Sequence, residues 1–274
     1  MTSRLGDCQL ADLRATLTDR DRAILETLRK LRCVRTNQIQ RLFFLDSSTP
    51  RACLTATMKA LNRLKTYGLI NHLPREVGGV RSGSKGIIWY LAEPGIRLLN
   101  LGSDVTARTR FVQPSPSYMR HTIAVSECYV QITEICRTGR AMRLKRIELE
   151  PECWRGYTMN GKNQSLRPDL YAETASGRFE DSWFIEMDLA TESVHDIIEK
   201  CNRYYFYYGT QKEQHATGVF PVVLWIVPSD ARKEAITDAL KRTFHSRHNP
   251  IHLIITPNQL WSVLTDGARQ EDLI

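Results

Sequence analysis

Three acidic side chains lie in two apolar runs of the second half of the sequence. Asp169 opens the run DLYAE, and Glu186 and Asp188 lie inside the run WFIEMDL. Residues at i and i+2 of a strand point to the same face, so Glu186 and Asp188 are expected to project together. A hairpin through residues 174–182 would bring Asp169 alongside them. The spacing therefore predicts three carboxylates at one place.

Carboxylates grouped in this way repel one another unless a cation lies between them. Ligand sets made only of oxygen favour a hard ion, so the three acids predict a Mg²⁺ or Mn²⁺ site. Such an ion polarises a phosphodiester and lowers the pKa of bound water, which makes that water a nucleophile. The residues leave one alternative open, in which the carboxylates pair with Arg or Lys at the edge of the sheet.

A series of helices and strands in residues 113–274 must position these acids. The periodicity predicts helices at 118–139, 194–209 and 230–244 and strands at 142–150, 169–173, 183–189, 219–229 and 251–257. This order predicts a mixed sheet with helices on both faces, so the fold class is α/β (α+β).

The first half of the sequence predicts three helices and a hairpin. The helices are expected at 18–32, at 36–44 with Thr36 as its cap, and from 48 to a stop at Gly68. Two strand-like runs, 69–73 and 87–91, then enclose a loop rich in Gly, Ser, Arg and Lys. Three helices followed by a hairpin are typical of a winged helix-turn-helix, whose third helix enters the major groove of DNA.

The charge distribution favours DNA as the partner of this first half. Residues 1–112 hold 19 Lys and Arg against 9 Asp and Glu, whereas residues 113–274 hold 19 against 21. A basic segment of this kind indicates binding to a polyanion, although a winged helix used for protein contacts stays an alternative.

The third helix should bind DNA with the face opposite its apolar stripe, which is Leu54, Met58, Leu61 and Leu64. This places Arg51, Thr55, Lys59 and Arg63 towards DNA. The hairpin loop should contact phosphates through Arg75, Arg81, Ser84 and Lys85.

The polar stretch 102–117 predicts a boundary between two domains, 1–112 and 113–274. No apolar run approaches the ~20 residues that a membrane span requires, so we expect no membrane insertion. The seven cysteines are scattered and form no CxxC pair. This predicts cysteines that fill the core of a cytoplasmic protein, with neither a disulfide framework nor a zinc site.

The pattern Pro168-Asp169…Glu186-x-Asp188 resembles the PD-(D/E)xK nuclease superfamily, which has the restriction-endonuclease-like fold. The resemblance implies that the Asp and Glu bind metal and that a Lys two residues after the Glu orients the attacking water. Asp188 stands at the position of that Lys. Either Lys200 on the next helix supplies the amine, or Asp188 is itself a ligand. The resemblance also implies Glu127, on the helix before the sheet, as a further metal ligand.

The chain as a whole resembles the replication-relaxation family and its MobC-type plasmid relaxases. The motifs that carry this resemblance are LTDRDRAILETL, LINHL, HTIAVSE, LRPDLYAE, FIEMDLATES and RYYFYY. The resemblance implies binding at a plasmid origin of transfer, metal-dependent nicking of one strand and delivery through a coupling protein, with an accessory relaxosome protein as a further partner. Some relatives act only as DNA-binding accessory or replication-control proteins, which is the alternative function.

Other residues suggest rival chemistry. The tyrosines at 204, 205, 207 and 208 could form a covalent DNA intermediate or could simply pack. The histidines in HSRHNPIH could bind zinc, but their charged and Pro-containing spacers favour a loop. His121 could contact phosphate or transfer a proton, or cap a helix end. Arg167 could bind a phosphate or form a surface salt bridge.

Overall fold

The computed structural model describes residues 6–45, 49–73, 86–102, 115–138, 142–177, 179–245 and 249–274. The chain is a mixed α/β protein that divides into two compact units, residues 1–130 (unit 1) and 131–274 (unit 2). The division lies inside helix α6 (Pro116–Thr138) and not at residue 112. The first part of that helix packs within unit 1, where the Ser126 hydroxyl donates a 2.9 Å hydrogen bond to the Cys33 carbonyl.

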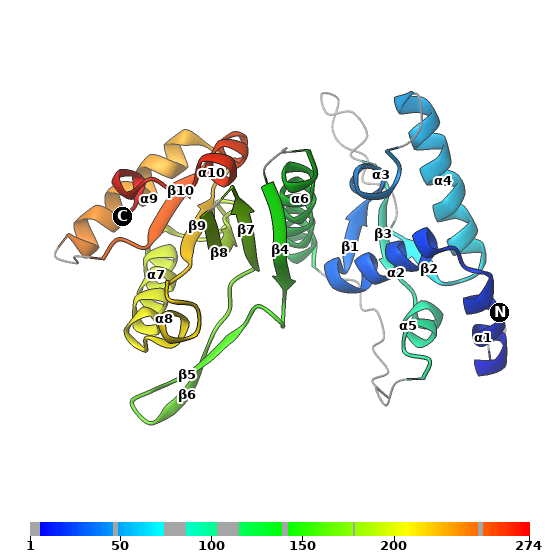
Figure 1. Cartoon of the computed structure of the whole chain (residues 1–274), viewed down its shortest axis with the longest axis horizontal. Coiled ribbons are helices and arrows are strands. Elements are labelled where there is room, and N and C mark those ends of the chain that lie inside the picture. The colour runs from blue at the N-terminus through cyan, green and yellow to red at the C-terminus, as the bar shows by residue number, and fades with distance from the viewer. Residues whose placement is uncertain are drawn as a thin grey trace. The chain divides into compact units, whose positions relative to one another are not determined.

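Unit 1 combines helices with a small antiparallel sheet of strand order β1-β3-β2 (Figure 1). The expected helices and the two strands of the expected hairpin are present, and β1, α1 and α5 were not predicted. The elements before α6 are α1 (Asp7–Thr16), α2 (Asp19–Leu31), β1 (Cys33–Arg35), α3 (Thr36–Phe43), α4 (Pro50–Thr66), β2 (Ile70–His72), β3 (Ile88–Leu91) and α5 (Glu93–Leu99).

Local signals determine where these helices begin and end. The Thr18 side chain accepts a hydrogen bond from the Asp21 amide and caps α2. Helix α4 begins after Thr49 with Pro at its first position, and Gly68, at φ 72°, follows its end. Thr36 is not the cap of α3, as the sequence suggested. It is the first helical residue, and its hydroxyl accepts a hydrogen bond from the buried Trp89 indole.

Helix α4 buries a different stripe from the expected one. Leu61 and Leu64 are buried, but Leu54 is 46% exposed. The buried face runs instead through Cys53, Thr57 and Ala60. Cys53, Thr57, Ala60 and Leu64 follow one another at intervals of four, three and four residues, so they share one face of the helix. Leu54 comes one residue after Cys53 and therefore lies to the side of this face.

Unit 2 is built on a five-stranded mixed sheet of order β10-β9-β8-β7-β4 (Figure 1). The pairs β4–β7 and β7–β8 are antiparallel, and the pairs β8–β9 and β9–β10 are parallel. The strands are β4 (Met142–Leu149), β7 (Leu170–Ser176), β8 (Phe179–Met187), β9 (Val222–Ile226) and β10 (His252–Ile255). The predicted mixed sheet is confirmed.

A second, separate sheet consists of β5 (Arg155–Met159) and β6 (Lys162–Leu166), which we call the ribbon (residues 155–166). It extends beyond the five-stranded sheet (Figure 1). The remaining elements of unit 2 are α7 (Val194–Gly209), α8 (Lys212–Thr217), α9 (Asp230–Phe244), η1 (Pro257–Gln259), α10 (Leu260–Asp266) and η2 (Gln270–Asp272).

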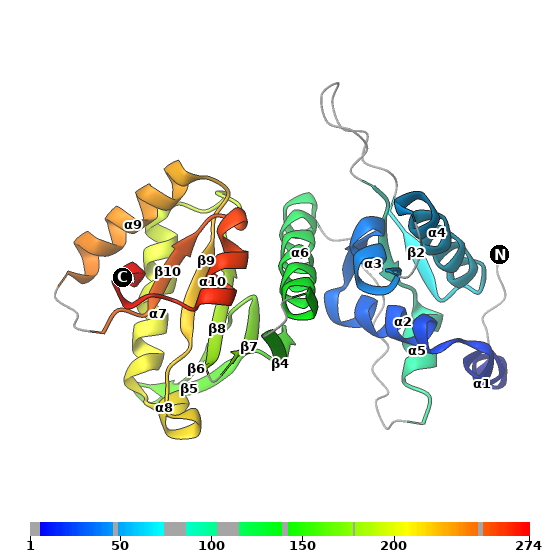
Figure 2. The same cartoon turned by 45° about the horizontal axis from the view of Figure 1, so that its top comes forward.

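A hydrophobic core of unit 2 lies on the face of the sheet that α7 and α9 cover. Phe184 of β8 and Trp225 of β9 pack there against Tyr204 of α7 and Leu240 of α9. Side chains alternate along a strand, so Trp183 points to the opposite face, where α10 lies (Figure 2). Both faces are buried, as expected for a sheet between two helical layers.

Candidate functional site

The β7–β8 hairpin brings Asp169 next to the end of β8. The Asp169 amide donates a 3.1 Å hydrogen bond to the Ile185 carbonyl, and its Oδ2 accepts one of 2.8 Å from the Met187 amide. Glu186 lies between these two partners on β8, directly opposite Trp225 of β9. Asp169 and Glu186 are therefore neighbours, as their spacing predicted.

Glu186 is a buried carboxylic acid, only 6% exposed. Its Oε1 accepts a 2.6 Å hydrogen bond from the Tyr204 hydroxyl. Burial raises the pKa of Glu186 to about 8, the charge of Asp169 adds to this rise, and Lys200 opposes it. Asp169 and Lys200 thus both lie close enough to act electrostatically on Glu186.

Lys200 reaches this group from α7. Its Nζ lies 2.8 Å and 3.0 Å from the two carboxylate oxygens of Glu192. Burial lowers the pKa of Lys200, but the carboxylates of Glu186, Glu192 and Asp169 outweigh burial, and the net effect is a raised pKa. The ammonium group is therefore held charged beside the acids.

Asp188 does not join the other two acids as a third ligand. Its carboxylate is buried and binds Arg232 of α9, with Nε at 2.6 Å and Nη2 at 3.3 Å. Arg232 also donates to the Glu192 carbonyl at 2.8 Å. Asp188 is therefore paired with an arginine, which is the alternative that the sequence left open. Within the described ranges, no three His, Cys, Asp or Glu side chains are arranged to hold a metal.

A pocket of about 460 Å³ opens above Glu186. One wall is the second strand of the ribbon, and the other is α7. Arg167 and Arg203 line it, and neither forms an ion pair with any residue that the structure describes. The Arg167 guanidinium lies 4.5 Å from the centre of the Trp154 ring. The full lining is Asn163, Gln164, Ser165, Leu166, Arg167, Glu186, Lys200, Arg203 and Tyr204.

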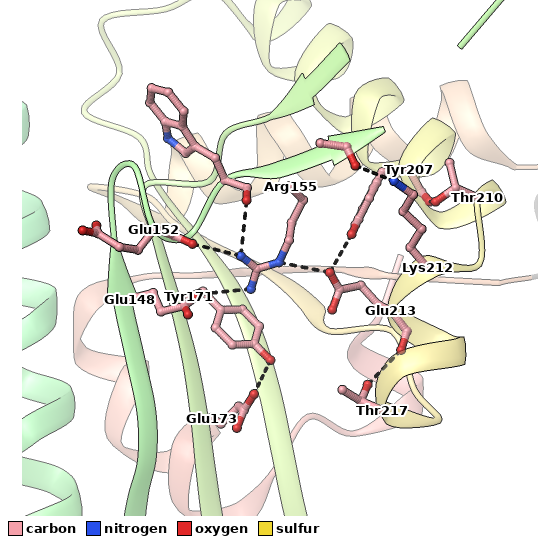
Figure 3. Close-up of polar contacts among 12 residues, drawn as sticks. Glu148, Glu152, Arg155, Tyr171, Glu173, Tyr207, Thr210, Lys212, Glu213 and Thr217 are labelled. Atoms are coloured by element: carbon pink, nitrogen blue, oxygen red, sulfur yellow. Dashed lines mark hydrogen bonds and ion pairs between the residues drawn. The ribbon is translucent and has the colours of Figure 1, made fainter. Parts of the chain in front are cut away.

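The base of the ribbon is held by a network centred on Arg155 (Figure 3). Its guanidinium lies 3.1 Å from Glu148 of β4 and 3.1 Å from Glu213 of α8. Glu213 also accepts a 2.6 Å hydrogen bond from the Tyr207 hydroxyl. The ring of Tyr171 lies 4.6 Å from the guanidinium. The network therefore fixes the pocket wall to the sheet and to α7 and α8.

Two residues expected at the acid site belong to unit 1. Glu127 accepts hydrogen bonds within that unit from Arg41 at 2.6 Å and from Gln38 at 2.9 Å. Its carboxylate is thus used to attach α3 to α6, which argues against a role as metal ligand. His121 also lies on α6 in unit 1, and its part in proton transfer stays a prediction.

The tyrosine cluster serves packing and carboxylate binding. Tyr204, Tyr205 and Tyr207 are buried, and Tyr208 packs against Phe220. Burial and the neighbouring Glu186 raise the pKa of Tyr204 well above its ordinary value, which disfavours the phenolate that a covalent mechanism needs.

The two described histidines of HSRHNPIH, His245 and His252, belong to no group of metal-binding side chains in the part of the chain that the structure describes. His252 is buried in β10 with its Nδ1 3.3 Å from the Trp225 indole nitrogen, whereas His245 is exposed beyond α9. His248 lies outside the described residues.

In unit 1, Arg51, Thr55 and Lys59 are exposed on α4, as a DNA-facing surface requires. Arg63 is not part of that surface as expected, because its guanidinium binds the buried Asp21 carboxylate at 2.7 Å and 2.8 Å. Arg75, Arg81, Ser84 and Lys85, the expected phosphate contacts of the hairpin loop, lie outside the described residues.

The sequence profile of the replication-relaxation family matches residues 25–223. The chain belongs to the replication-relaxation family. This family match runs from within α2 to the start of β9, so it includes α4 and the Glu186 pocket but ends before Arg232. No curated protein and no solved structure matches the chain. None of the helices in the described part of the chain has both the length and the apolar character needed to cross a membrane.

Proposed function

We propose that this member of the replication-relaxation family is a DNA nickase, which binds DNA through unit 1 and cleaves one strand at the Glu186 pocket. One observation carries the proposal. A buried acid with an acidic neighbour and a lysine forms the floor of a pocket whose walls present two arginines without described ion-pair partners. Such a combination suits a phosphodiester, which needs cations for its charge and acids for its activation.

The arrangement of unit 1 supports a winged helix-turn-helix. Helices α2, α3 and α4 precede the antiparallel pair β2–β3. On this interpretation α4 enters the major groove with Arg51, Thr55 and Lys59. The basic loop between β2 and β3 contacts the phosphate backbone.

The arrangement of unit 2 supports a restriction-endonuclease-like core. The order α6, β4, β7, β8, α7, β9 places Asp169 before one antiparallel strand and Glu186 on the next. Lys200 of α7 then replaces the lysine that the superfamily pattern has two residues after the Glu. Asp188, at that position, stabilises the loop through Arg232.

The donor set at the pocket fits a divalent ion held by Asp169 and Glu186. Mg²⁺ is commonly bound by one or two protein carboxylates together with substrate phosphate and water. Burial and, after it, the charge of Asp169 raise the pKa of Glu186, and a cation bound between the two acids would offset both effects. When bound there, Mg²⁺ or Mn²⁺ would supply an activated water and polarise the phosphodiester.

The other pocket residues have separate roles in this proposal. Arg167 and Arg203 bind the non-bridging phosphate oxygens. Lys200 orients the attacking water and stabilises the charge that develops on the phosphorus oxygens. Tyr204 holds the Glu186 carboxyl in place through its 2.6 Å hydrogen bond. In the family context, we propose a plasmid origin of transfer as the DNA, with a coupling protein and an accessory relaxosome protein as partners.

Incubation of supercoiled plasmid with the pure chain and Mg²⁺ or Mn²⁺ tests the proposal. The wild type should produce relaxed circles that disappear with EDTA. Glu186→Ala and Asp169→Ala should lose nicking and keep DNA binding, whereas Glu199→Ala on the exposed face of α7 should behave like the wild type. Full nicking by both pocket variants would rule out the proposed site.

A second candidate is a DNA-binding accessory or replication-control protein with a degenerate nuclease fold. The observation that favours it is Asp188, which stands in place of the pattern lysine and is bound by Arg232. This candidate predicts a gel shift of plasmid DNA without relaxed circles at any concentration of Mg²⁺ or Mn²⁺.

A further inference from the structure

The ribbon presents an exposed surface without negative charge. From Cys153 to Pro168 the sequence has no Asp or Glu, although residues 113–274 as a whole hold 21 acidic against 19 basic residues. The outer part of the ribbon, residues 160–165, is exposed throughout and carries Lys162, Asn163, Gln164 and Ser165. The surface is therefore made of hydrogen-bonding groups and a cation.

The ribbon has a tight turn at its tip and is bound to the rest of unit 2 at its base. At the tip, Asn160 and Gly161 have φ values of 51° and 71° and connect the strands by a two-residue turn. At the base, Arg155 binds Glu148 and Glu213, and the Lys212 ammonium donates to the Gly156 carbonyl at 2.7 Å. Figure 3 shows this attachment from several elements of unit 2. The ribbon can thus hold a position relative to the pocket.

We propose that the ribbon is a second DNA-binding element, which contacts duplex DNA beside the phosphate held in the pocket. This inference rests on the proposed function. A two-stranded β-ribbon fits the major groove of B-DNA, and Asn and Gln amides can hydrogen-bond base edges there. Lys162 at the tip and Arg167 at the base are placed to contact phosphates on either side. Arg167 lines the pocket and directly follows Leu166, the last residue of the ribbon, so the two contacts are continuous.

The salt dependence of DNA binding by the full chain tests this inference in EDTA, where no cleavage occurs. The probe is a fluorescent duplex, and the affinity is measured by anisotropy over a series of salt concentrations. Lys162→Ala should reduce the slope of log K against log salt by about 0.9, the value for one lost phosphate contact. Lys241→Ala removes an exposed charge from α9 and should leave the slope unchanged.

Limited trypsin digestion gives a second measurement that needs no variant. Bound duplex should protect Lys162 from cleavage in the wild-type chain, and Lys241 should stay equally accessible with and without DNA. A slope for Lys162→Ala equal to that of the wild type, or equal digestion at Lys162 with and without DNA, would overturn the proposal.

The ribbon and the nickase proposals can fail separately. A reduced slope for Lys162→Ala together with an absence of nicking would support DNA binding by the ribbon and refute cleavage at the pocket. Nicking that depends on Glu186, together with an unchanged slope for Lys162→Ala, would support cleavage and refute DNA binding by the ribbon. Absence of any DNA binding by the full chain would refute both.

Discussion

Arg232 binds the buried carboxylate of Asp188 at 2.6 Å and also donates to the Glu192 carbonyl at 2.8 Å. The loop after β8 is thereby closed, with the Ala190 amide donating to Asp188 at 2.8 Å. The same loop carries the Glu192 carboxylate that binds Lys200. Asp188 therefore acts on the pocket through the loop it stabilises, and the amine of the pocket comes from α7.

Arg232→Ala should destabilise the chain by about 3–5 kcal/mol, because it leaves the Asp188 carboxylate buried without its cation. Urea denaturation of unit 2 measures the change. The double variant Arg232→Ala with Asp188→Ala should lose less than the sum of the single losses, since no unpaired charge remains. Additive losses would show that the two side chains do not interact in solution.

The stability of the chain should fall with rising pH through the titration of Glu186. The folded state raises its pKa from the ordinary 4.5 to about 8, so between these values the folded state binds more protons than the unfolded state. The contribution of Glu186 to the free energy of unfolding is thus highest below pH 4.5, and it is lost as the pH rises to about 8.

Glu186→Gln should remove this loss, because an amide stays neutral and its oxygen still accepts from Tyr204. In EDTA, the stability of the variant relative to wild type should rise by at most about 1.4 kcal/mol per pH unit within that window. Urea denaturation at pH 5, 7 and 9 measures it, with Glu199→Gln as the matched control. Parallel curves for wild type and Glu186→Gln would contradict the burial of a titrating acid.

Two basic residues of α4 should respond differently to truncation. Arg63→Ala should cost on the order of 1–3 kcal/mol, because Asp21 is only 2% exposed and loses a charged partner. Lys59→Ala should change stability by less than about 0.5 kcal/mol and reduce the salt slope of DNA binding by about 0.9. Thermal denaturation and anisotropy distinguish them, and an unchanged slope for Lys59→Ala would speak against α4 as the DNA-facing helix.

Arg155→Ala should release the base of the ribbon. It leaves the largely buried Glu213 without its guanidinium, whereas Glu148 keeps its ion pair with Arg146, so we expect a cost on the order of 1–3 kcal/mol. Trypsin should then cleave at Lys162 faster than in the wild type, which mass spectrometry of the fragments detects. Lys241→Ala serves as the control. An unchanged rate at Lys162 would mean that the Arg155 network does not restrain the ribbon.

The helices of this chain could be predicted well from sequence because their signals are local. Helix α9 has the bounds expected for it, 230–244, and α2 begins after the expected cap, Thr18. The same reasoning placed Asp169 beside β8, because a hairpin and the alternation of side chains decide that contact. These are effects of neighbouring residues.

The ribbon and the ion pairs were missed because their causes are not local. Residues 162–165 are all polar and exposed, so β6 shows no apolar alternation, and only the Asn160-Gly161 turn could have revealed it. Arg232 meets Asp188 from 44 residues away, and Arg63 meets Asp21 from 42 residues away. No helical periodicity shows which basic residue has a distant carboxylate to bind.

The two sheets of unit 2 share no hydrogen-bonded strand, since the ribbon forms a sheet of its own. Glu186 lies on β8, which is bonded on both sides by β7 and β9. A foreign hairpin that keeps Arg155 and Leu166 at its ends could therefore be grafted in place of residues 156–165 without breaking a rung of the five-stranded ladder. Such a graft would replace Asn163, Gln164 and Ser165 on the pocket wall and would leave Glu186 on β8 and Lys200 on α7 in place.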